Sequence, residues 1–182
     1  MDNAQELYAR FLSGDAAAFD DLVRTFRVPL TRFLTAYLHD PFLAQDVAAD
    51  CFAYVWAYPK RYNFKSGVKT YLFMLGRSRA IDRLRREKRT VFVEPDDPVL
   101  FAGASAGPQE DTEEKEKRAA LRQAVRALPE DERQAVYLVY DEELSYKDAA
   151  KVLGKSEKQV DHLLVKARRH LKAALKDWGE SL

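Results

Sequence analysis

The sequence predicts an all-α protein made of two small helical domains joined by a flexible acidic linker. Apolar residues recur at spacings of three and four on both sides of residues 93–116, as they do along the buried face of a helix. Within that segment, prolines, glycines and many carboxylates interrupt the periodicity. We therefore predict domains at residues 1–92 and 117–182.

Composition and charge narrow the class of protein. The chain has 182 residues, of which 47% are hydrophobic and 12% aromatic, enough to build folded cores. Its net charge of +1 averages a basic region in each domain with the acidic segment between them. The single cysteine, Cys51, excludes an intramolecular disulfide and fits a reducing compartment. With no membrane-length apolar stretch and no signal peptide, a soluble cytoplasmic protein is expected.

The first domain begins with a long helical pattern. Asp15 can cap a helix whose apolar positions run through residues 22–37. Pro29 lies inside this pattern, so a kink or break is expected there. A turn is predicted at residues 39–41, where the sequence is His-Asp-Pro.

A second amphipathic helix is predicted over residues 42–58. Asp46 and Asp50 are one turn apart in it, so both carboxylates share a face. On the residues alone, a solvated face is the first interpretation and a partner-binding patch is the second. A metal site is disfavoured because no nearby histidine or third carboxylate completes it.

Aromatic residues then lead into a dense basic run. The aromatic residues are Tyr62, Phe64, Tyr71 and Phe73, and the basic residues are Arg77, Arg79, Arg83, Arg85, Arg86, Lys88 and Arg89. Rings beside arginines suit single-stranded nucleic acid, because bases stack on the rings while guanidinium groups hold phosphates. A core aromatic cluster followed by a solvated basic helix end explains the same pattern equally well.

The acidic segment and the start of the second domain follow. Residues 93–116 either keep two modules apart and soluble, or occupy a basic, nucleic-acid-like channel on a partner. A helix is predicted over residues 121–128, stopped by Pro129. Pro129 can begin the next helix as its first residue, and the three carboxylates that follow suit a first turn.

Residues 144–171 have the pattern of a helix-turn-helix. A short helix at 146–153 ends before Gly154, a residue suited to the left-handed conformation that terminates helices. Ser156 can then cap a second helix. The outer face of that helix carries Lys158, His162, Lys166 and Arg169. Such a helix can enter a DNA major groove, although an ordinary pair of surface helices would show the same spacing.

The order of these motifs resembles the extracytoplasmic-function sigma factors of bacterial RNA polymerase. The resemblance covers residues 18–175 except the linker. The core-binding helices of the family are similar to AFDDLVRTF (18–26) and DVAADCFAYVW (46–56). Its minus-10 segment is similar to VKTYLFMLGRSRAIDRLRRE (68–87). The domain that binds the minus-35 element in this family is similar to ALPEDERQAVYL (127–138), LSYKDAAKVLGKSEKQV (144–160) and KARRHL (166–171).

The resemblance implies a fold, a function and three sets of residues. The domains would be a sigma region 2-like bundle and a region 4-like helix-turn-helix, which bind core polymerase, recognise both promoter elements and help melt DNA. Polymerase binding would involve Asp46, Asp50, Phe52 and Trp56. Minus-10 recognition would involve Tyr71, Arg77, Ser78, Arg79, Arg83, Arg85 and Arg86. Minus-35 recognition would involve Lys158, Gln159, Asp161, His162, Val165, Lys166, Arg168 and Arg169, the last two as phosphate contacts.

Four positions depart from the family pattern. Ala49 stands where a glutamine is usual, Ser78 where an asparagine is usual, and Leu163 where an arginine is usual. Asp161 replaces a usual lysine or arginine. An aspartate can accept a hydrogen bond from cytosine but repels phosphate, so a weak or unusual minus-35 contact is expected.

The remaining predictions concern the binding partners of the chain and the alternatives to a sigma-factor function. The resemblance implies core RNA polymerase and promoter DNA as partners, leaves an anti-sigma factor open, and requires no cofactor or metal. A stand-alone helix-turn-helix regulator that binds duplex DNA without polymerase is one alternative, and a helical adaptor that binds only proteins is another. An enzyme is the least favoured class, because no catalytic triad, phosphate loop or metal-ligand spacing is present.

Overall fold

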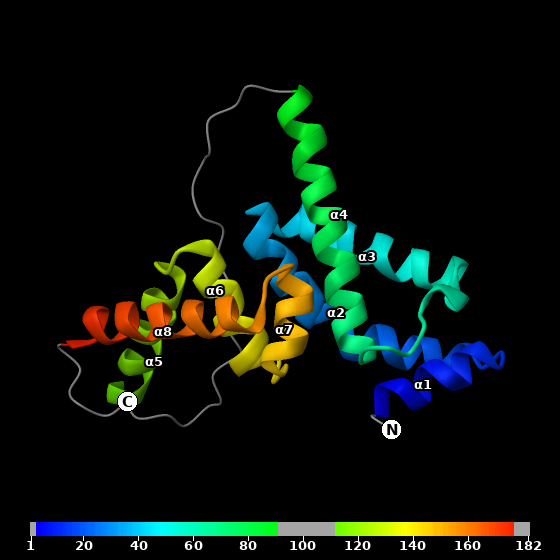
Figure 1. The fold of residues 1–182 in the computed structure, drawn as a ribbon, viewed down its shortest axis with the longest axis horizontal. Helices are drawn as coiled ribbons and strands as arrows, with labels where there is room; N and C mark the ends of the chain where they lie inside the picture. The colour runs from blue at the N-terminus through cyan, green and yellow to red at the C-terminus, as the bar shows by residue number, and fades with distance from the viewer. Residues whose placement is uncertain (1–2, 91–111, 177–182) are drawn as a thin grey trace.

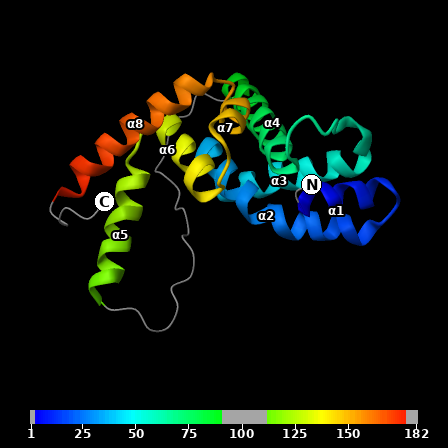
Figure 2. The ribbon, with the colours of Figure 1, turned by 60° about the horizontal axis from the view of Figure 1, so that its bottom comes forward.

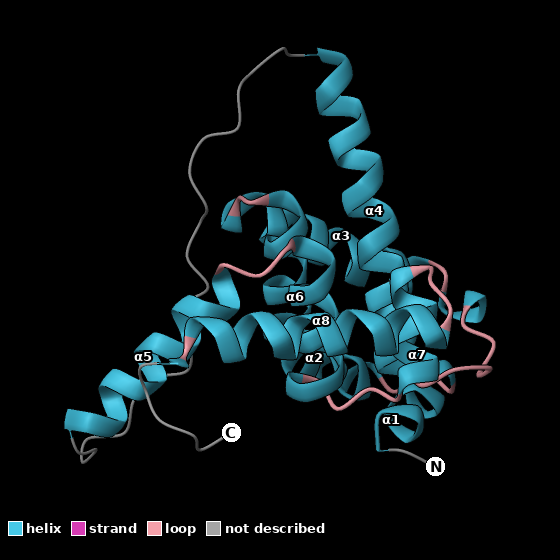
Figure 3. Cartoon of the chain, turned by 60° about the vertical axis from the view of Figure 1, so that its left-hand side comes forward, coloured by secondary structure: helices cyan, strands magenta, loops and turns pink. Residues whose placement is uncertain are grey.

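A computed structural model of the chain describes residues 3–90 and 112–176, and every regular element among them is helical (Figures 1 and 3), which confirms the all-α prediction. The first module contains α1 (Asn3–Leu12), α2 (Ala16–Leu38), α3 (Pro41–Ala57), the 3-10 turn η1 (Pro59–Arg61) and α4 (Val68–Thr90). The second contains α5 (Thr112–Arg126), α6 (Glu130–Val136), the π-helical turn η2 (Tyr137–Asp141), α7 (Tyr146–Leu153) and α8 (Glu157–Ala174). None of these helices is long and apolar enough to cross a membrane.

Side-chain caps determine where the first long helices begin and end. Asp15 Oδ1 accepts a hydrogen bond from the Ala18 backbone N–H at 3.2 Å, which confirms the predicted cap of α2. His39 ends α2 with a left-handed φ of 53°. Asp40 Oδ1 then accepts from the Phe42 N–H at 2.8 Å, so the predicted turn is confirmed as well.

The prediction at Pro29 was a kink or a break, and the break is wrong because helix α2 continues through Pro29. A proline inside a helix costs about 3 kcal/mol, because it removes a backbone hydrogen bond and crowds the preceding turn. Phe26, Leu30 and Phe33 flank it and are at most 4% exposed. Burial of this face against α3 and α4 stabilises the helix on both sides of the proline.

Helix α1 was not predicted, and an aromatic cluster holds it in place. Tyr8 is fully buried, and its ring lies 4.7 Å from the ring of Tyr62, centroid to centroid. Its hydroxyl donates to the Pro59 carbonyl at 2.9 Å. The residues after α3 therefore anchor the N-terminal helix to the bundle.

The second module begins earlier than predicted. Helix α5 starts at Thr112, so residues 112–116 of the predicted linker are helical, while its residues 93–111 lie outside the described ranges. Carboxylates are favourable in the first turn of a helix, so acidic composition alone did not separate linker from helix. Pro129 precedes α6 as its N-cap residue instead of being its first residue.

The two modules touch, whereas one of the two interpretations of residues 93–116 was that they keep the modules apart. Helix α7 lies against α4, and α6 approaches α2 (Figures 1 and 2). Leu138, Val152 and Leu153 of the second module join the same buried apolar cluster as Leu30 and Phe73 of the first. The two helical bundles therefore share a continuous core in this arrangement.

Candidate nucleic-acid interface

The start of α8 is fixed by a reciprocal pair of hydrogen bonds. Ser156 Oγ accepts from the Gln159 backbone N–H at 3.2 Å, and Gln159 Oε1 accepts from the Ser156 N–H at 2.8 Å. Gly154 ends α7 with a φ of 63°, as predicted. The side-chain oxygen of Gln159, a predicted minus-35 contact, is therefore occupied by this cap.

Helix α8 separates a buried face from an exposed one. Val160, Leu164 and Ala167 are at most 3% exposed and pack inward. On the other side, Lys158, Gln159, Asp161, His162, Val165, Arg168 and Arg169 are exposed, and Lys166 is half-buried. All eight predicted minus-35 residues thus have accessible side chains on one helix, the geometry that groove recognition requires.

Polar contacts fix α8 to the rest of its module. His170 Nδ1 lies 2.7 Å from Glu132 Oε2, and Glu132 is only 5% exposed. Arg168 Nη2 donates to the Tyr140 hydroxyl at 3.4 Å. These contacts join α8 to α6 and η2, which sets the angle at which the exposed face is presented.

Two of the predicted minus-10 arginines on α4 pack against tyrosines. Arg77 Nε donates to the Tyr37 hydroxyl at 3.0 Å. The Arg79 guanidinium carbon lies 4.9 Å from the centroid of the Tyr54 ring, a cation–π distance. Both arginines are half-buried, whereas the sequence alone predicted them as part of an open basic surface.

The tyrosine partner of Arg77 is strongly affected by its surroundings. Burial raises the pKa of Tyr37 to about 12, although the nearby Arg77 charge opposes the rise. The phenol therefore stays neutral and accepts a hydrogen bond from the guanidinium at physiological pH. Sequence reasoning missed this role because Tyr37 fits the apolar stripe of α2.

The rest of the predicted minus-10 set lies along α4. Ser78, Arg83, Arg85 and Arg86 are exposed. Arg85 Nη1 is 4.0 Å from Asp82 Oδ1, a separation at the limit of an ion pair and open to solvent. Tyr71 is half-buried, with its ring 5.1 Å from that of Tyr62, so the predicted aromatic platform is partly a packing cluster.

The predicted polymerase-binding residues on α3 do not all point outward. Asp46 and Asp50 are exposed, and Trp56 is 52% exposed while it stacks on Phe11 with centroids 5.4 Å apart. Phe52 is only 6% exposed. Three of the four residues therefore offer surface, and Phe52 contributes mainly to packing.

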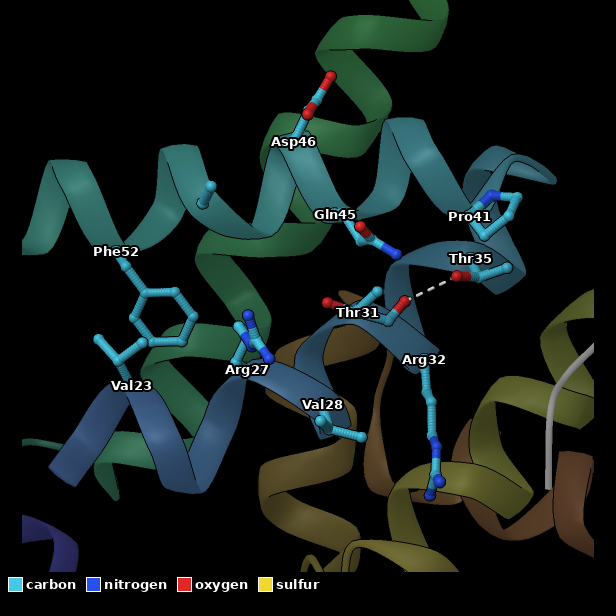
Figure 4. Close-up of a pocket in the computed structure, with 11 residues that line it drawn as sticks. Val23, Arg27, Val28, Thr31, Arg32, Thr35, Pro41, Gln45, Asp46 and Phe52 are labelled. Carbon is cyan, nitrogen blue, oxygen red and sulfur yellow. Dashed lines mark hydrogen bonds between the residues drawn. The ribbon is translucent and has the colours of Figure 1, made fainter. Parts of the chain in front are cut away.

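Phe52 also lines a groove between α2 and α3 with a volume of about 780 Å³ (Figure 4). In Figure 4 its ring faces Val23, while Asp46 points away from the α2 side. Arg27 and Arg32 supply positive charge along the α2 wall, and both are exposed. Sequence reasoning missed these two arginines because α2 was considered only for its buried stripe.

The described side chains offer neither a metal-binding cluster nor a reactive thiol. Within the side chains described at residues 3–86 and 116–176, no group of three His, Cys, Asp or Glu is placed to hold a metal ion. Burial raises the pKa of Cys51 to about 12, so the thiol is protonated at neutral pH and is a poor nucleophile.

Comparison with known proteins identifies both modules. The sigma-70 region 2 model matches residues 22–90, and the sigma-70 region 4 model matches residues 118–171. The chain is 32% identical over 156 residues to the ECF RNA polymerase sigma factor SigM of Bacillus subtilis, covering 85% of this chain and 93% of that protein. It is 31% identical over 181 residues to the RNA polymerase sigma-H factor of Pseudomonas aeruginosa, covering 94% of this chain and 93% of that protein.

The two modules together define a sigma-70 type transcription factor. The chain belongs to the extracytoplasmic-function sigma factors, which direct transcription by RNA polymerase.

Solved structures show the same fold. CnrH in complex with the cytosolic domain of CnrY has a TM-score of 0.65 at 24% identity, with 97% of this chain and 99% of that chain covered. RpoE in complex with the anti-sigma factor NepR, from Bartonella quintana, has a TM-score of 0.66 at 23% identity, with coverages of 87% and 96%.

Proposed function

We propose that this chain binds core RNA polymerase and directs it to promoters through two DNA elements, with α8 at the minus-35 element and α4 at the minus-10 element. The exposed strip of α8, opposite its buried face, is the observation that carries the DNA-binding part of the proposal. Membership of the sigma family supports the polymerase part.

At the minus-35 element, base and phosphate contacts divide along α8. Asp161 and His162 project from the first half of the helix and Lys166 from its middle, and all three are proposed to face base edges. Arg168 and Arg169 lie toward its second half and are proposed to hold phosphates, which fixes the register without selecting sequence.

At the minus-10 element, α4 is proposed to hold the melted strand. Arg83, Arg85 and Arg86 are exposed and close in sequence, so they can follow a phosphate backbone. Tyr71 and Ser78 are proposed to lie beside the flipped base. Assistance in melting follows, because stacking and phosphate contacts stabilise the single strand relative to the duplex.

The polymerase is proposed to contact the exposed face of α3 that carries Asp46, Asp50 and Trp56. An anti-sigma factor is proposed as a further partner, since RpoE of Bartonella quintana is solved in complex with one.

Reconstituted transcription tests the proposed function. The chain is mixed with purified core RNA polymerase and a pool of randomised promoter fragments, and transcript 5′ ends are sequenced. Start sites that depend on the chain, with two enriched upstream elements, are expected. Asp46→Arg combined with Asp50→Arg should abolish this dependence, because two positive charges replace the carboxylates proposed to contact polymerase.

A matched control separates a local effect from a change in overall charge. Glu6→Arg combined with Glu116→Arg makes the same charge change at two exposed positions outside both segments that resemble the core-binding helices. This variant should keep full transcription. If the α3 variant is as active as the wild type, the assignment of α3 to polymerase is wrong; if no transcript ever depends on the chain, the proposed function is wrong.

A further inference from the structure

The contact between the two modules is not used by the proposed function. Helix α7 lies against α4, and the α6–η2 segment approaches α2 (Figures 1 and 2). The rings of Phe33 on α2 and Tyr137 on η2 stack with centroids 6.4 Å apart. A cluster of polar groups lies beside this stack.

Four residues make up the polar cluster. The Tyr137 hydroxyl lies 2.9 Å from the Pro29 carbonyl oxygen and 2.8 Å from Glu142 Oε1, so its single proton is shared between two acceptors. Lys69 on α4 donates to the Glu142 carbonyl at 2.8 Å, and its Nζ is 3.1 Å from Glu142 Oε2. Residues of α2 and α4 in the first module thus meet residues at η2 in the second.

Because Glu142 is buried, its carboxylate depends on partners that it would lose if the two modules separated. Glu142 is 8% exposed, and a buried carboxylate is unfavourable unless it is paired and hydrogen-bonded. Its cationic partner, Lys69, comes from the other module. A buried ion pair adds little net stability, because desolvation offsets the attraction, yet it strongly favours the one geometry that satisfies both charges.

The closed arrangement also partly covers one residue of the proposed minus-10 surface. A Cβ at Gly154, in the turn after α7, would lie 3.4 Å from Arg77 Nη1. The other side of the Arg77 guanidinium is hydrogen-bonded to Tyr37. Arg77 therefore lies half-buried at the contact between the modules, so only part of its side chain is open to DNA in this arrangement.

We propose that Lys69, Tyr137 and Glu142 form a latch that holds the free chain closed, and that the latch opens when the chain engages polymerase and promoter DNA. The significance of covering Arg77 rests on the proposed function. In the closed form the helix-turn-helix is held against α4, so the two DNA-binding surfaces cannot be placed independently. Opening returns Glu142 to water and frees Arg77.

The latch is tested by measuring the distance between the modules in the free chain. Nitroxide labels are attached at Asp20→Cys on α2 and Arg122→Cys on α5, both exposed, with the buried Cys51 changed to Ala. Double electron–electron resonance should give one narrow distribution. In Tyr137→Phe and in Lys69→Met, a longer and broader population should appear, with the closed-to-open ratio lowered about tenfold or more, as expected for lost hydrogen bonds to a charged group.

Controls make the outcome decisive. Lys155→Ala breaks the 2.9 Å ion pair with Asp131 inside the second module and should leave the distribution unchanged. Tyr137→Phe keeps the ring that stacks on Phe33, so this variant decides the question if Lys69→Met loses its circular dichroism signal. An unchanged distribution in the folded latch variants, or an equal shift in Lys155→Ala, would overturn the latch.

The two proposals fail independently. The distance measurement contains neither polymerase nor DNA, so an unchanged distance alongside normal reconstituted transcription rejects the latch alone. Opening of the latch variants without any chain-dependent transcription rejects the proposed function alone.

Discussion

Lys166 and Arg169 lie three residues apart on α8, but we expect them to contribute differently to binding. Lys166 is half-buried near the middle of the helix, where a side chain in the major groove meets base edges. Arg169 is exposed toward the second half, where phosphates are the nearer partners. Specificity and affinity should therefore be separable at single residues.

Lys166→Ala should change the preferred minus-35 sequence, because a good base contact contributes about 1–3 kcal/mol of discrimination. Arg169→Ala should weaken binding by a similar factor for every sequence and reduce its salt dependence. A binding selection on randomised minus-35 DNA at two salt concentrations measures both effects. If Lys166→Ala retains the wild-type preference for the minus-35 sequence, the Lys166 side chain makes no base contact.

At the scale of single residues, the sequence predicted which side chains form a basic or aromatic surface better than where those side chains lie in the fold. The arginine run on α4 was evident, yet Arg77 and Arg79 are half-buried against Tyr37 and Tyr54. No local pattern signals these pairs, because their members are 40 and 25 positions apart in the chain. Phe52 was assigned to an outward face although it is buried, since a helix at a bundle edge contacts more than one neighbour.

Elements were predicted best where side chains bond to their own backbone. The α7–turn–α8 unit follows its capping residues closely: Ser145 and Ser156 accept from backbone N–H groups three residues ahead, and Gly154 is left-handed. Helix α1 and the start of α5 were not predicted, because tertiary packing and an ambiguous acidic composition decide them. Local chemistry is present in the sequence, whereas the contact between modules depends on the fold.

The turn between α7 and α8 provides a test at the scale of one element. Gly154→Ala should lower the free energy of unfolding by about 1–2 kcal/mol, because a φ of 63° strains a residue with a Cβ. Contact with Arg77 adds little, since the new Cβ would be an ordinary 3.4 Å from Nη1. Gly154→Asn should recover much of the loss, because asparagine tolerates this conformation. Urea denaturation measures both, and equal stability of the Ala and Asn variants would contradict the strain argument.

At the scale of the whole molecule, the shared core couples the stability of one module to that of the other. The modules were predicted as separate bundles, but Leu138 and Val152 of the second lie in one buried cluster with Phe73 of the first. Disturbing the interface should therefore be detected in both modules. Tyrosines that are buried or half-buried are distributed across this structure: Tyr8 holds α1, Tyr37 faces α4, and the half-buried Tyr137 joins the modules.

Alkaline pH should weaken the whole fold through these phenols. Burial raises the pKa of Tyr8, Tyr37 and Tyr137 above the ordinary value of 10.0, with the Glu142 charge adding to the rise at Tyr137. Because the unfolded chain loses these protons first, and loses the proton of the buried Cys51 thiol at still lower pH, the free energy of unfolding should begin to fall near pH 9.0 and fall more steeply above pH 10. Urea denaturation from pH 7 to 11.5 measures the slope, which Tyr137→Phe should reduce. A profile that stays flat to pH 11.5 would mean that the buried phenols ionise as easily in the folded chain as in the unfolded one.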